Sequence, residues 1–277
     1  MRCRWCHNPE LIEPAQQLIQ MPRSCIRCGY CLTNCPQNAI CLDEEERIQI
    51  DREKCDLCFA CVDFCYAQAL RKVAKEMTPA EVLRTVLQDK EFYDSTGGGM
   101  TLSGGEMLMH GAFCEELIGL AAKEGVRVCL DTSGYGDGEL LLRLAGKENV
   151  SDILYDMKAI DDSIHQEYVG QSNALILENL RSLAKDPFIR GKIRMRMPLV
   201  AGVNDGQDMI EKTAELYKEL GLKKLTLLPY HDLGLAKMRN IGGEPEAFEA
   251  PSDERVEEIR GFFRDAAGMD VEILGKL

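Results

Sequence analysis

Two cysteine runs with the same spacing constrain the fold of this 277-residue chain more than any other feature. The runs comprise Cys25, Cys28, Cys31 and Cys35, and then Cys55, Cys58, Cys61 and Cys65. Each has the pattern C-x2-C-x2-C-x3-C, and Pro36 follows the first run where Tyr66 follows the second. Eleven of the thirteen cysteines precede residue 66, whereas a disulfide framework would spread them along a short secreted chain. The repeat therefore indicates a compact metal-binding segment.

The spacing is typical of a segment that holds two 4Fe–4S clusters. Three closely spaced thiolates surround one cluster, and the fourth cysteine of each run ligates the other cluster. On this logic one cluster is bound by Cys25, Cys28, Cys31 and Cys65, and the other by Cys55, Cys58, Cys61 and Cys35. Two zinc sites are the alternative, but zinc uses pairs of C-x2-C and leaves the third cysteine of each run unexplained.

Composition narrows the choice of partners and compartment. The chain has 33 Lys plus Arg against 46 Asp plus Glu, a net charge of −13, so nucleic acid and anionic membranes are poor partners. It has no apolar run near the ~20 residues of a membrane span. Its first residues include no apolar signal segment. We therefore expect a cytoplasmic protein.

After residue 77 the sequence alternates between apolar runs and amphipathic stretches. Thr78, Pro79 and Glu81 have the arrangement of a helix start, with a cap, a first-turn proline and a capping-box partner. Strands are expected at 99–103, 126–131, 153–158, 192–200 and 223–229, with a short edge strand at 271–274. Helices are expected at about 110–124, 138–146, 173–186, 208–220 and 253–266. This alternation predicts βαβ units and a parallel sheet.

Polar or glycine residues follow or end each of the main expected strands. They are Gly104, Gly105 and Glu106; Asp131, Thr132, Ser133 and Gly134; Asp156, Met157 and Lys158; Arg196, followed by Ala201 and Gly202; and Tyr230 and His231. In parallel α/β sheets and barrels, ligands bind at the carboxyl ends of the strands. Ordinary turn and capping chemistry would explain any single strand end, but five together predict a common ligand site.

The opening residues from Cys3 to Glu10 read CRWCHNPE and resemble the second half of the radical SAM signature C-x3-C-x2-C. More narrowly, WCHNPE resembles the glycyl radical enzyme activating enzymes, relatives of the pyruvate formate-lyase activase. Later segments resemble the same family in the expected order: STGGGMTLSGGE, DTSGY, LYDMK, RMPLVAGVND and LLPYHDLGLAKMRNIG. The resemblance covers essentially the whole chain, and the cysteine module matches the subgroup with two auxiliary clusters.

This resemblance implies a fold and a reaction. The fold would be a partial (β/α)6 barrel of the TIM type, with its first strand missing and with an inserted ferredoxin-like domain. The domains would be 1–20, a remnant of the radical cluster loop; 21–76, the insert; and 77–277, the barrel. The cofactors would be one radical SAM cluster, two auxiliary 4Fe–4S clusters and S-adenosyl-L-methionine. Reductive cleavage of that cofactor would give a 5′-deoxyadenosyl radical, which takes a hydrogen from a glycine of a partner enzyme. Flavodoxin or ferredoxin would donate the electron, and the free protein would be a monomer.

The resemblance also implies roles for single residues. Cys3 and Cys6 would ligate the radical cluster. The methionine amino end of the cofactor would be held by Gly104, Gly105 and Glu106. Further cofactor-binding positions would be Asp156, Met157, Lys158 and, on the adenosyl side, His231. Asp131 and Thr132 match positions near a monovalent cation in one family member, and Arg196 would position the methionine moiety or the substrate loop.

The first cysteine of the signature would lie two residues before Met1. With only Cys3 and Cys6 as thiolate ligands, we expect a weakly bound radical cluster and poor activity of this polypeptide. Two other functions stay open on the sequence: a radical SAM enzyme acting on a small molecule or peptide, and a ferredoxin-like electron carrier on a degenerate barrel. Intact GGE, DMK and PYH segments argue against the second.

Overall fold

The structure is a computed structural model that describes residues 1–275, and the chain forms two compact units. Unit 1 comprises Met1–Arg4, Met77–His231 and the segment from Phe248 onward. Unit 2 comprises Trp5–Glu76 and Asp232–Ala247. Each unit therefore combines segments that are distant in the sequence.

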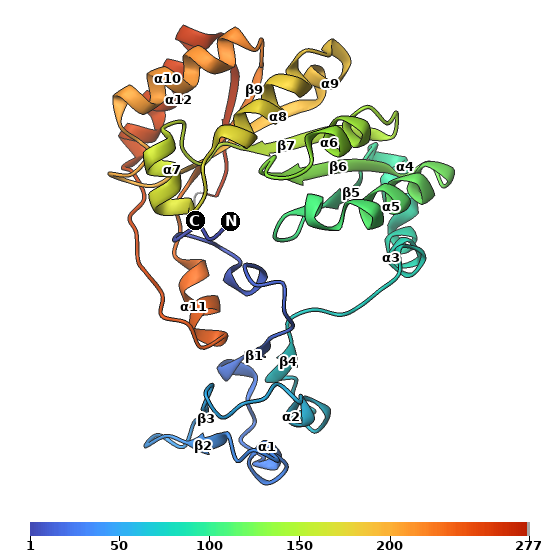
Figure 1. Ribbon diagram of the computed structural model, residues 1–277, viewed down its shortest axis with the longest axis vertical. Coiled ribbons are helices and arrows are strands. Elements are labelled where there is room, and N and C mark those ends of the chain that lie inside the picture. Colours follow the sequence, from blue (N-terminus) through green and yellow to red (C-terminus); the bar gives the residue numbers. More distant parts are fainter. Residues whose placement is uncertain (276–277) are drawn as a thin grey trace. The chain divides into compact units, whose positions relative to one another are not determined.

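A parallel sheet forms the centre of unit 1 (Figure 1). Its strands are β5 (Gly99–Leu102), β6 (Arg127–Thr132), β7 (Val150–Asp156), β8 (Ile193–Leu199), β9 (Lys224–Pro229) and β10 (Asp270–Ile273). They lie side by side in chain order, from β5 at one edge to β10 at the other, and every neighbouring pair is parallel. Right-handed crossovers in such a sheet bring the connecting helices to one face. The predicted strands, including the edge position of the last one, are confirmed.

Helices connect these strands. Those of unit 1 are α3 (Pro79–Val86), α4 (Lys90–Thr96), α5 (Gly111–Lys123), α6 (Gly138–Ala145), α7 (Asp162–Val169), α8 (Ala174–Ala184), α9 (Pro187–Lys192), α10 (Gln207–Glu219) and α12 (Asp253–Ala267), with 3-10 turns η3 (Leu87–Asp89) and η4 (Met107–His110). The five predicted helices are confirmed to within a few residues. Neither α7 nor α9 was predicted, because α7 has few apolar residues and α9 is short.

Side-chain caps fix where these helices begin. The Thr78 hydroxyl accepts from the Glu81 N–H at 3.3 Å, and the Glu81 carboxylate accepts from the Thr78 N–H at 2.8 Å, so the predicted capping box is present. Asp137, Asp161 and Asp186 cap α6, α7 and α9 in the same sense, through backbone N–H groups of the first turn. These N–H groups have no acceptor within the helix, which is why an acidic residue at this position is stabilising.

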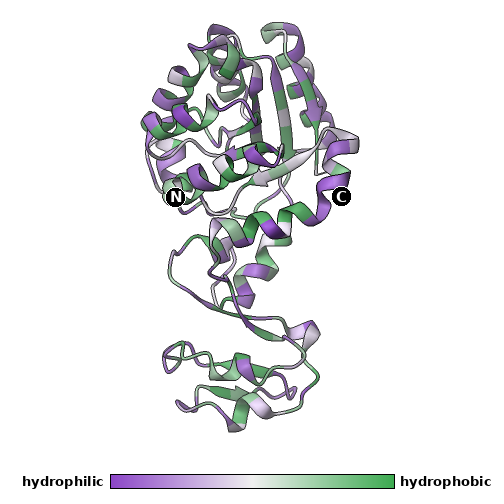
Figure 2. Ribbon diagram, turned by 90° about the vertical axis from the view of Figure 1, so that its right-hand side faces the viewer, coloured by the Kyte–Doolittle hydropathy of each residue, from purple (hydrophilic) through white to green (hydrophobic). Residues whose placement is uncertain are grey.

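The two faces of the sheet differ in polarity because successive side chains of a strand point to opposite sides. In β8 the buried side chains are those of Ile193, Met195, Met197 and Leu199. Arg194 and Arg196 point to the other face. Figure 2 shows the resulting apolar strands inside unit 1. One face of the sheet thus forms the hydrophobic core, and the opposite face is available for polar chemistry.

Unit 2 contains small antiparallel sheets and short helices (Figure 1). Strand β1 (Leu18–Gln20) pairs with β4 (Leu70–Lys72), and β2 (Ile40–Leu42) pairs with β3 (Ile48–Ile50). The helices are α1 (Tyr30–Thr33), α2 (Ala60–Asp63) and α11 (Leu233–Asn240), with 3-10 turns η1 (Pro9–Leu11) and η2 (Pro22–Ser24). The buried core of the cysteine-rich part consists of Leu18, Ile40, Ile48, Cys61 and Leu70. Bound metal would add folding free energy to so small a core.

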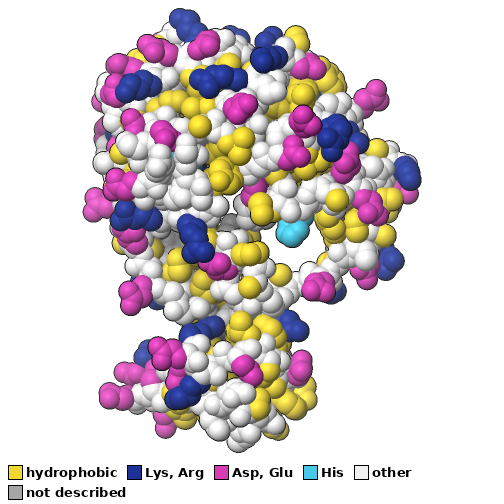
Figure 3. All heavy atoms as spheres, viewed as in Figure 1, with side chains coloured by type: hydrophobic (Ala, Val, Ile, Leu, Met, Phe, Trp, Pro, Cys, Tyr) yellow, Lys and Arg dark blue, Asp and Glu magenta, His cyan; other side chains and the backbone are white. Residues whose placement is uncertain are grey.

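Within residues 1–275, no helix is long and apolar enough to cross a membrane. Figure 3 shows acidic and basic side chains interspersed over the visible face of unit 1.

Candidate active site

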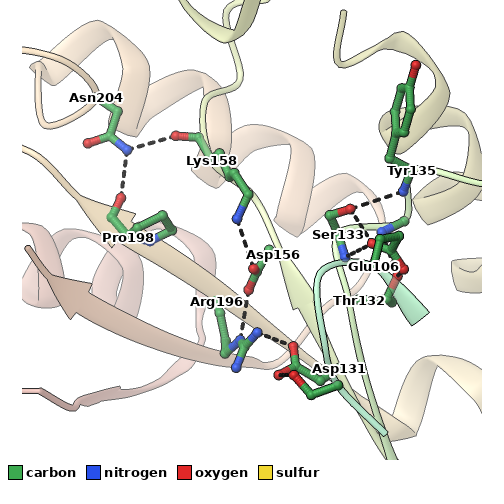
Figure 4. Close-up of polar contacts among 12 residues, drawn as sticks. Glu106, Asp131, Thr132, Ser133, Tyr135, Asp156, Lys158, Arg196, Pro198 and Asn204 are labelled. Carbon is green, nitrogen blue, oxygen red and sulfur yellow. Dashed lines mark hydrogen bonds and ion pairs between the residues drawn. The ribbon is translucent and has the colours of Figure 1, made fainter. Parts of the chain in front are cut away.

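A chain of alternating charges crosses the sheet of unit 1 near the carboxyl ends of its strands (Figure 4). Asp156 of β7 lies opposite Arg196 of β8, and Arg196 Nε donates to Asp156 Oδ1 at 2.8 Å. The same guanidinium donates through Nη2 to Asp131 of β6. Lys158 Nζ donates to Asp156 Oδ2 at 3.0 Å, and Ser103, just after β5, donates to Asp131 at 2.9 Å. The network therefore joins four neighbouring strands.

These charged groups are shielded from solvent and balance one another. Side-chain exposure ranges from 14% for Lys158 to 20% for Arg196. Burial opposes ionisation of Asp156, but the charges of Lys158 and Arg196 outweigh it and lower the pKa of the carboxyl. Burial also opposes the charge of Arg196, while Asp156 and Asp131 raise the pKa of its guanidinium. The lowered pKa of Asp156 and the raised pKa of Arg196 thus favour the ionised forms of this pair.

Glu106 joins the loop after β5 to the end of β6. Its Oε1 accepts from the Thr132 hydroxyl at 2.7 Å and from the Leu108 N–H at 3.2 Å. Its Oε2 accepts from the N–H of Ser133 at 2.9 Å and from the hydroxyl of the same residue (Figure 4). A carboxylate offers about four lone-pair positions. The protein itself therefore supplies donors for the whole carboxylate, which fixes the loop containing Gly104 and Gly105.

Two glycines in these loops have backbone conformations that other residues rarely adopt. Gly104 has φ +143° and Gly134 has φ +74°. A Cβ on Gly134 would lie 1.8 Å from the hydroxyl of Tyr155, which is fully buried and donates to Ile176 O at 2.7 Å. The loop after β6 therefore needs glycine at 134, both for its backbone angle and for its close contact with β7.

Cys3 lies beside the same charges. Burial raises the pKa of its thiol. Two side-chain charges also act on this thiol: the charge of Lys158 lowers its pKa, and the charge of Asp156 raises it. Arg2 N–H donates to Val169 O at 2.9 Å. The structure therefore brings one of the two predicted radical-cluster ligands to the strand-end network.

The end of α7 holds the loop that contains Cys3. Arg4 N–H donates to Tyr168 O at 2.9 Å, and this carbonyl, like that of Val169, is among the last of α7 and has no partner within the helix. The Arg4 guanidinium lies 4.7 Å from the ring centre of Tyr168 and 5.8 Å from that of Phe248. These contacts fix the backbone on both sides of Cys3.

The other predicted positions in unit 1 follow the same strands. Met157 is buried, and its N–H donates to Arg196 O at 2.9 Å. His231 comes two residues after β9, where the Tyr230 N–H donates to Leu199 O at 2.9 Å. β7 begins at Val150 and ends at Asp156, so Met157 and Lys158 lie just beyond it, whereas the sequence placed them within the strand. Arg196 lies within β8 rather than at its end.

Sequence reasoning assigned no individual role to Ser103, Ser133 and Asn204. Asn204 is buried, accepts from the Val200 N–H at 2.8 Å, and donates to Lys158 O at 2.7 Å and to Pro198 O at 2.6 Å (Figure 4). All three occur inside the motif segments quoted above. Their roles depend on contacts between strands, which the motifs themselves do not specify.

Four cysteines line one cavity of unit 2. They are Cys25, Cys28, Cys31 and Cys65. Three come from the first run and one from the end of the second, which is the combination predicted for one cluster. All cysteines in residues 1–275 are free thiols, so each can serve as a ligand. Within the same residues no group of three or more His, Cys, Asp or Glu is arranged around a single ion.

Cys61, from the second predicted set, lies in a buried cluster against which cysteines of both sets pack. This thiol is buried, and burial together with the neighbouring Cys55, Cys31 and Cys35 raises its pKa to about 11. Cluster binding requires thiolates, so such a crowded group of thiols is stabilised by iron, which deprotonates them. The donor set thus fits clusters better than it fits free thiols.

The two cysteine runs share a backbone conformation. The residues on either side of the second cysteine have positive φ in both: Arg27 (56°) and Gly29 (75°), and Leu57 (59°) and Phe59 (61°). Asn38 and Gln68, each three residues after the last cysteine of its run, also have positive φ. Left-handed conformations of non-glycine residues cost about 1–3 kcal/mol each and concentrate at ligand sites. Turns of this kind direct backbone N–H groups inward, as at many iron–sulfur sites.

Comparison with known proteins identifies both modules. The family model of the Radical SAM superfamily matches residues 58–217, which is more than half of the chain. The model of the 4Fe-4S dicluster domain matches residues 24–81. The fold and the cysteine module together define a radical SAM protein with additional iron–sulfur clusters.

Individual relatives narrow this class. The isethionate sulfite-lyase activating enzyme of Desulfovibrio desulfuricans is 38% identical over 88% of this chain and 78% of its own length. The trans-4-hydroxy-L-proline dehydratase activating enzyme of Clostridioides difficile is 35% identical over 99% of this chain and 90% of its own. A crystal structure of a domain of the pyruvate-formate lyase-activating enzyme from Bacteroides vulgatus is 28% identical, with a TM-score of 0.50, and the match covers 64% of this chain and 99% of that domain.

The chain therefore belongs to the glycyl radical enzyme activating enzymes of the radical SAM superfamily. It uses 4Fe–4S clusters and S-adenosylmethionine, and it generates a radical on a glycine of a partner enzyme. The family, the reaction and the cofactors predicted from the sequence are confirmed.

Proposed function

We propose that the charge network of unit 1 is the S-adenosylmethionine site of this activating enzyme. The observation that carries this proposal is the position of Cys3 beside Asp156 and Lys158, at the carboxyl end of β7. A thiol that can bind iron and a balanced set of charges are thus close together. A zwitterionic cofactor with amino, carboxylate and sulfonium groups needs donors and acceptors of both signs.

The roles of the polar residues follow from their contacts. Gly104 and Gly105 would receive the methionine amino end, since glycines let a ligand approach the backbone closely. Glu106 would hold that loop in place through its hydrogen bonds to Thr132 and Ser133. Lys158 and Arg196 would balance the cofactor carboxylate.

Four further positions complete the proposed site. They are Asp131 and Asp156, which orient the two cations, Met157, which would belong to the cofactor-binding segment, and His231, which would lie on the adenosyl side.

The cysteines would hold three clusters. Cys3 and Cys6, separated by two residues, would ligate the radical cluster, and the two repeated runs would hold the auxiliary pair. The radical cluster, when bound and reduced, supplies the electron that cleaves the cofactor. The residues of the charge network would bind the cofactor and orient it.

The finer architecture is part of the proposal. Residues 77–277 would form a partial (β/α)6 barrel, supported by the chain-order parallel sheet of β5 to β10. Residues 21–76 would form an inserted ferredoxin-like domain, supported by the repeated loop conformations around Cys28 and Cys58. Residues 1–20 would contain the radical cluster loop.

The partner is a glycyl radical enzyme, and the relatives suggest which ones to test. Two of them are named for isethionate sulfite-lyase and for trans-4-hydroxy-L-proline dehydratase. We propose enzymes of these two kinds as the first candidates. Flavodoxin or ferredoxin would donate the electron, and the free activating enzyme would be a monomer.

The proposal is tested with the protein at its full natural length, reconstituted anaerobically with iron and sulfide. Incubation with reductant, S-adenosylmethionine and each partner should yield 5′-deoxyadenosine and a glycyl radical signal in electron paramagnetic resonance (EPR) spectra. Arg196→Ala should abolish cofactor cleavage, whereas Arg194→Ala, two residues earlier in β8, should retain it. Intact clusters with cleavage unaffected by Arg196→Ala would contradict the assigned site.

A further inference from the structure

Arg52 in unit 2 has a charge for which the protein supplies no carboxylate. Its side chain is half-buried, and within residues 1–275 it forms no ion pair with Asp or Glu. Instead Nη1 donates to Leu18 O at 2.7 Å and Nη2 donates to Asn240 O at 3.3 Å. Partial burial of a cation without an opposite charge is unfavourable. A nearby anion other than Asp or Glu would therefore stabilise the charge of Arg52.

The cysteines of the second run can supply that anion, because Leu18, whose carbonyl accepts from Arg52, lies in one buried cluster with Cys61, and Cys35 and Cys55 pack against that cluster. Burial lowers the pKa of the Arg52 guanidinium, and Cys55 and Cys61 are the groups whose negative charge opposes this shift. Both belong to the set predicted to hold one auxiliary cluster. Their thiols lose protons when iron binds, so the occupied site is anionic. Reduction adds a further negative charge to it.

Contacts with α11 hold the guanidinium in place. Asn240 is the last residue of this helix, and a cation is favourable beside the carbonyl groups that end a helix. Gly242 packs directly on the Arg52 side chain: it has φ +84°, and a Cβ there would lie 2.8 Å from Arg52 Nε. The Leu18 carbonyl holds the guanidinium from β1. The side chain is thus fixed from two segments of unit 2.

The opposite end of α11 is anchored as well. A Cβ on Gly234 would lie 2.5 Å from Cys6 O, and Lys237 Nζ donates to the side chain of Asn8. An eight-residue helix is about 12 Å long. Both ends of α11 are therefore held by contacts, and its last carbonyl has a fixed position beside Arg52. This contact limits the rotation of the guanidinium.

We propose that Arg52 sets the reduction potential of the auxiliary cluster held by Cys35, Cys55, Cys58 and Cys61. A fixed positive charge favours the more negative, reduced state of a nearby cluster and so raises its potential. In this role Arg52 contacts neither cofactor nor substrate; it acts through its fixed positive charge on the cluster. The inference rests on the cluster ligands assigned under the proposed function.

The test is a potentiometric titration of the full-length reconstituted protein, followed by EPR. Four variants are compared with the wild type: Arg52→Gln, Arg52→Lys, Gly242→Ala and, as a control, Arg47→Gln. Arg47 is exposed and pairs with Asp43 and Glu45, so its replacement changes the net charge by the same amount without changing the surroundings of the cysteines. Iron content and cluster signals are measured first in every sample.

Arg52→Gln should shift the midpoint of one auxiliary cluster to more negative potential and leave the other near its wild-type value. Arg52→Lys should shift it less, Gly242→Ala should give a partial shift by displacing the side chain, and Arg47→Gln should change neither. A shift with Arg52→Gln no larger than with Arg47→Gln, at full iron content, overturns the inference alone. If Arg52→Gln cannot hold its clusters, an unchanged potential in Gly242→Ala overturns it. Absence of auxiliary-cluster signals from the wild type overturns the ligand assignment and this inference together.

Discussion

Arg196 lies directly opposite Asp156 in the register of β8 against β7, and its guanidinium also reaches Asp131 of β6. One side chain thus joins the carboxylates of two strands, at positions 40 and 65 residues away in the sequence. All three side chains are at most 20% exposed. Removal of the cation would leave Asp131 without its cationic partner and Asp156 with Lys158 alone.

Arg196→Ala should therefore destabilise the protein by about 3 kcal/mol, since breaking a buried ion pair leaves an uncompensated charge. Arg194→Ala is the matched control, because Arg194 lies on the same face of β8 but pairs with the half-exposed Glu272, and an exposed pair contributes at most about 1 kcal/mol. Urea denaturation under anaerobic conditions measures both. Equal losses in the two variants would show that the network contributes nothing beyond an ordinary surface pair.

Gly134→Ala should destabilise unit 1 by about 3 kcal/mol or more. The new Cβ would clash with the buried Tyr155 hydroxyl, and a positive φ adds its own cost. Gly125→Ala tests the backbone contribution alone, because Gly125 has φ +66° with no atom within 4 Å of the added Cβ. We expect a loss of about 1 kcal/mol there. Similar thermal midpoints for the two variants would rule out the steric contribution.

Asn204→Ala should weaken cofactor binding as well as stability. The change leaves the carbonyls of Lys158 and Pro198 without their donor and the Val200 N–H without its acceptor, at about 1–3 kcal/mol for each unsatisfied group. Because Lys158 is one of the affected residues, KM for S-adenosylmethionine should rise. Asn149→Ala is the control: it removes the hydrogen bonds from Asn149 to Ile118 O and Val126 O. This variant should destabilise the protein without raising KM. An unchanged KM for S-adenosylmethionine in Asn204→Ala would contradict the role of Lys158 in cofactor binding.

Cys61→Ser should reduce the iron content by about four atoms per chain, the content of one cubane cluster. Serine keeps the size of the side chain but is a poor ligand for iron. Cys41→Ser is the control, since Cys41 is exposed on β2 and belongs to neither predicted set. Iron analysis after identical reconstitution decides the matter. An equal loss in Cys41→Ser would mean that the ligand sets are wrong.

Much of the fold was predictable because its determinants are local. The capping box of Thr78 and Glu81, the strands from β5 to β10 and the edge position of β10 all follow from short-range patterns. Helices α7, α9 and α11 were not predicted, since their apolar positions are few or their lengths short. Their positions depend on what they pack against.

The sequence by itself determined the βα alternation, and it predicted the cysteine ligand sets and the motif residues of the site. Spacings of two or three residues decide which thiols can surround one cluster, because covalent geometry limits how far they can separate. Tertiary structure alone decided that Arg196 joins Asp131 to Asp156, that Glu106 is fully engaged by Thr132 and Ser133, and that Arg52 meets the end of α11. Those contacts depend on strand order, on register and on which face a side chain occupies. Such properties arise from pairing between distant segments, and no local pattern specifies them.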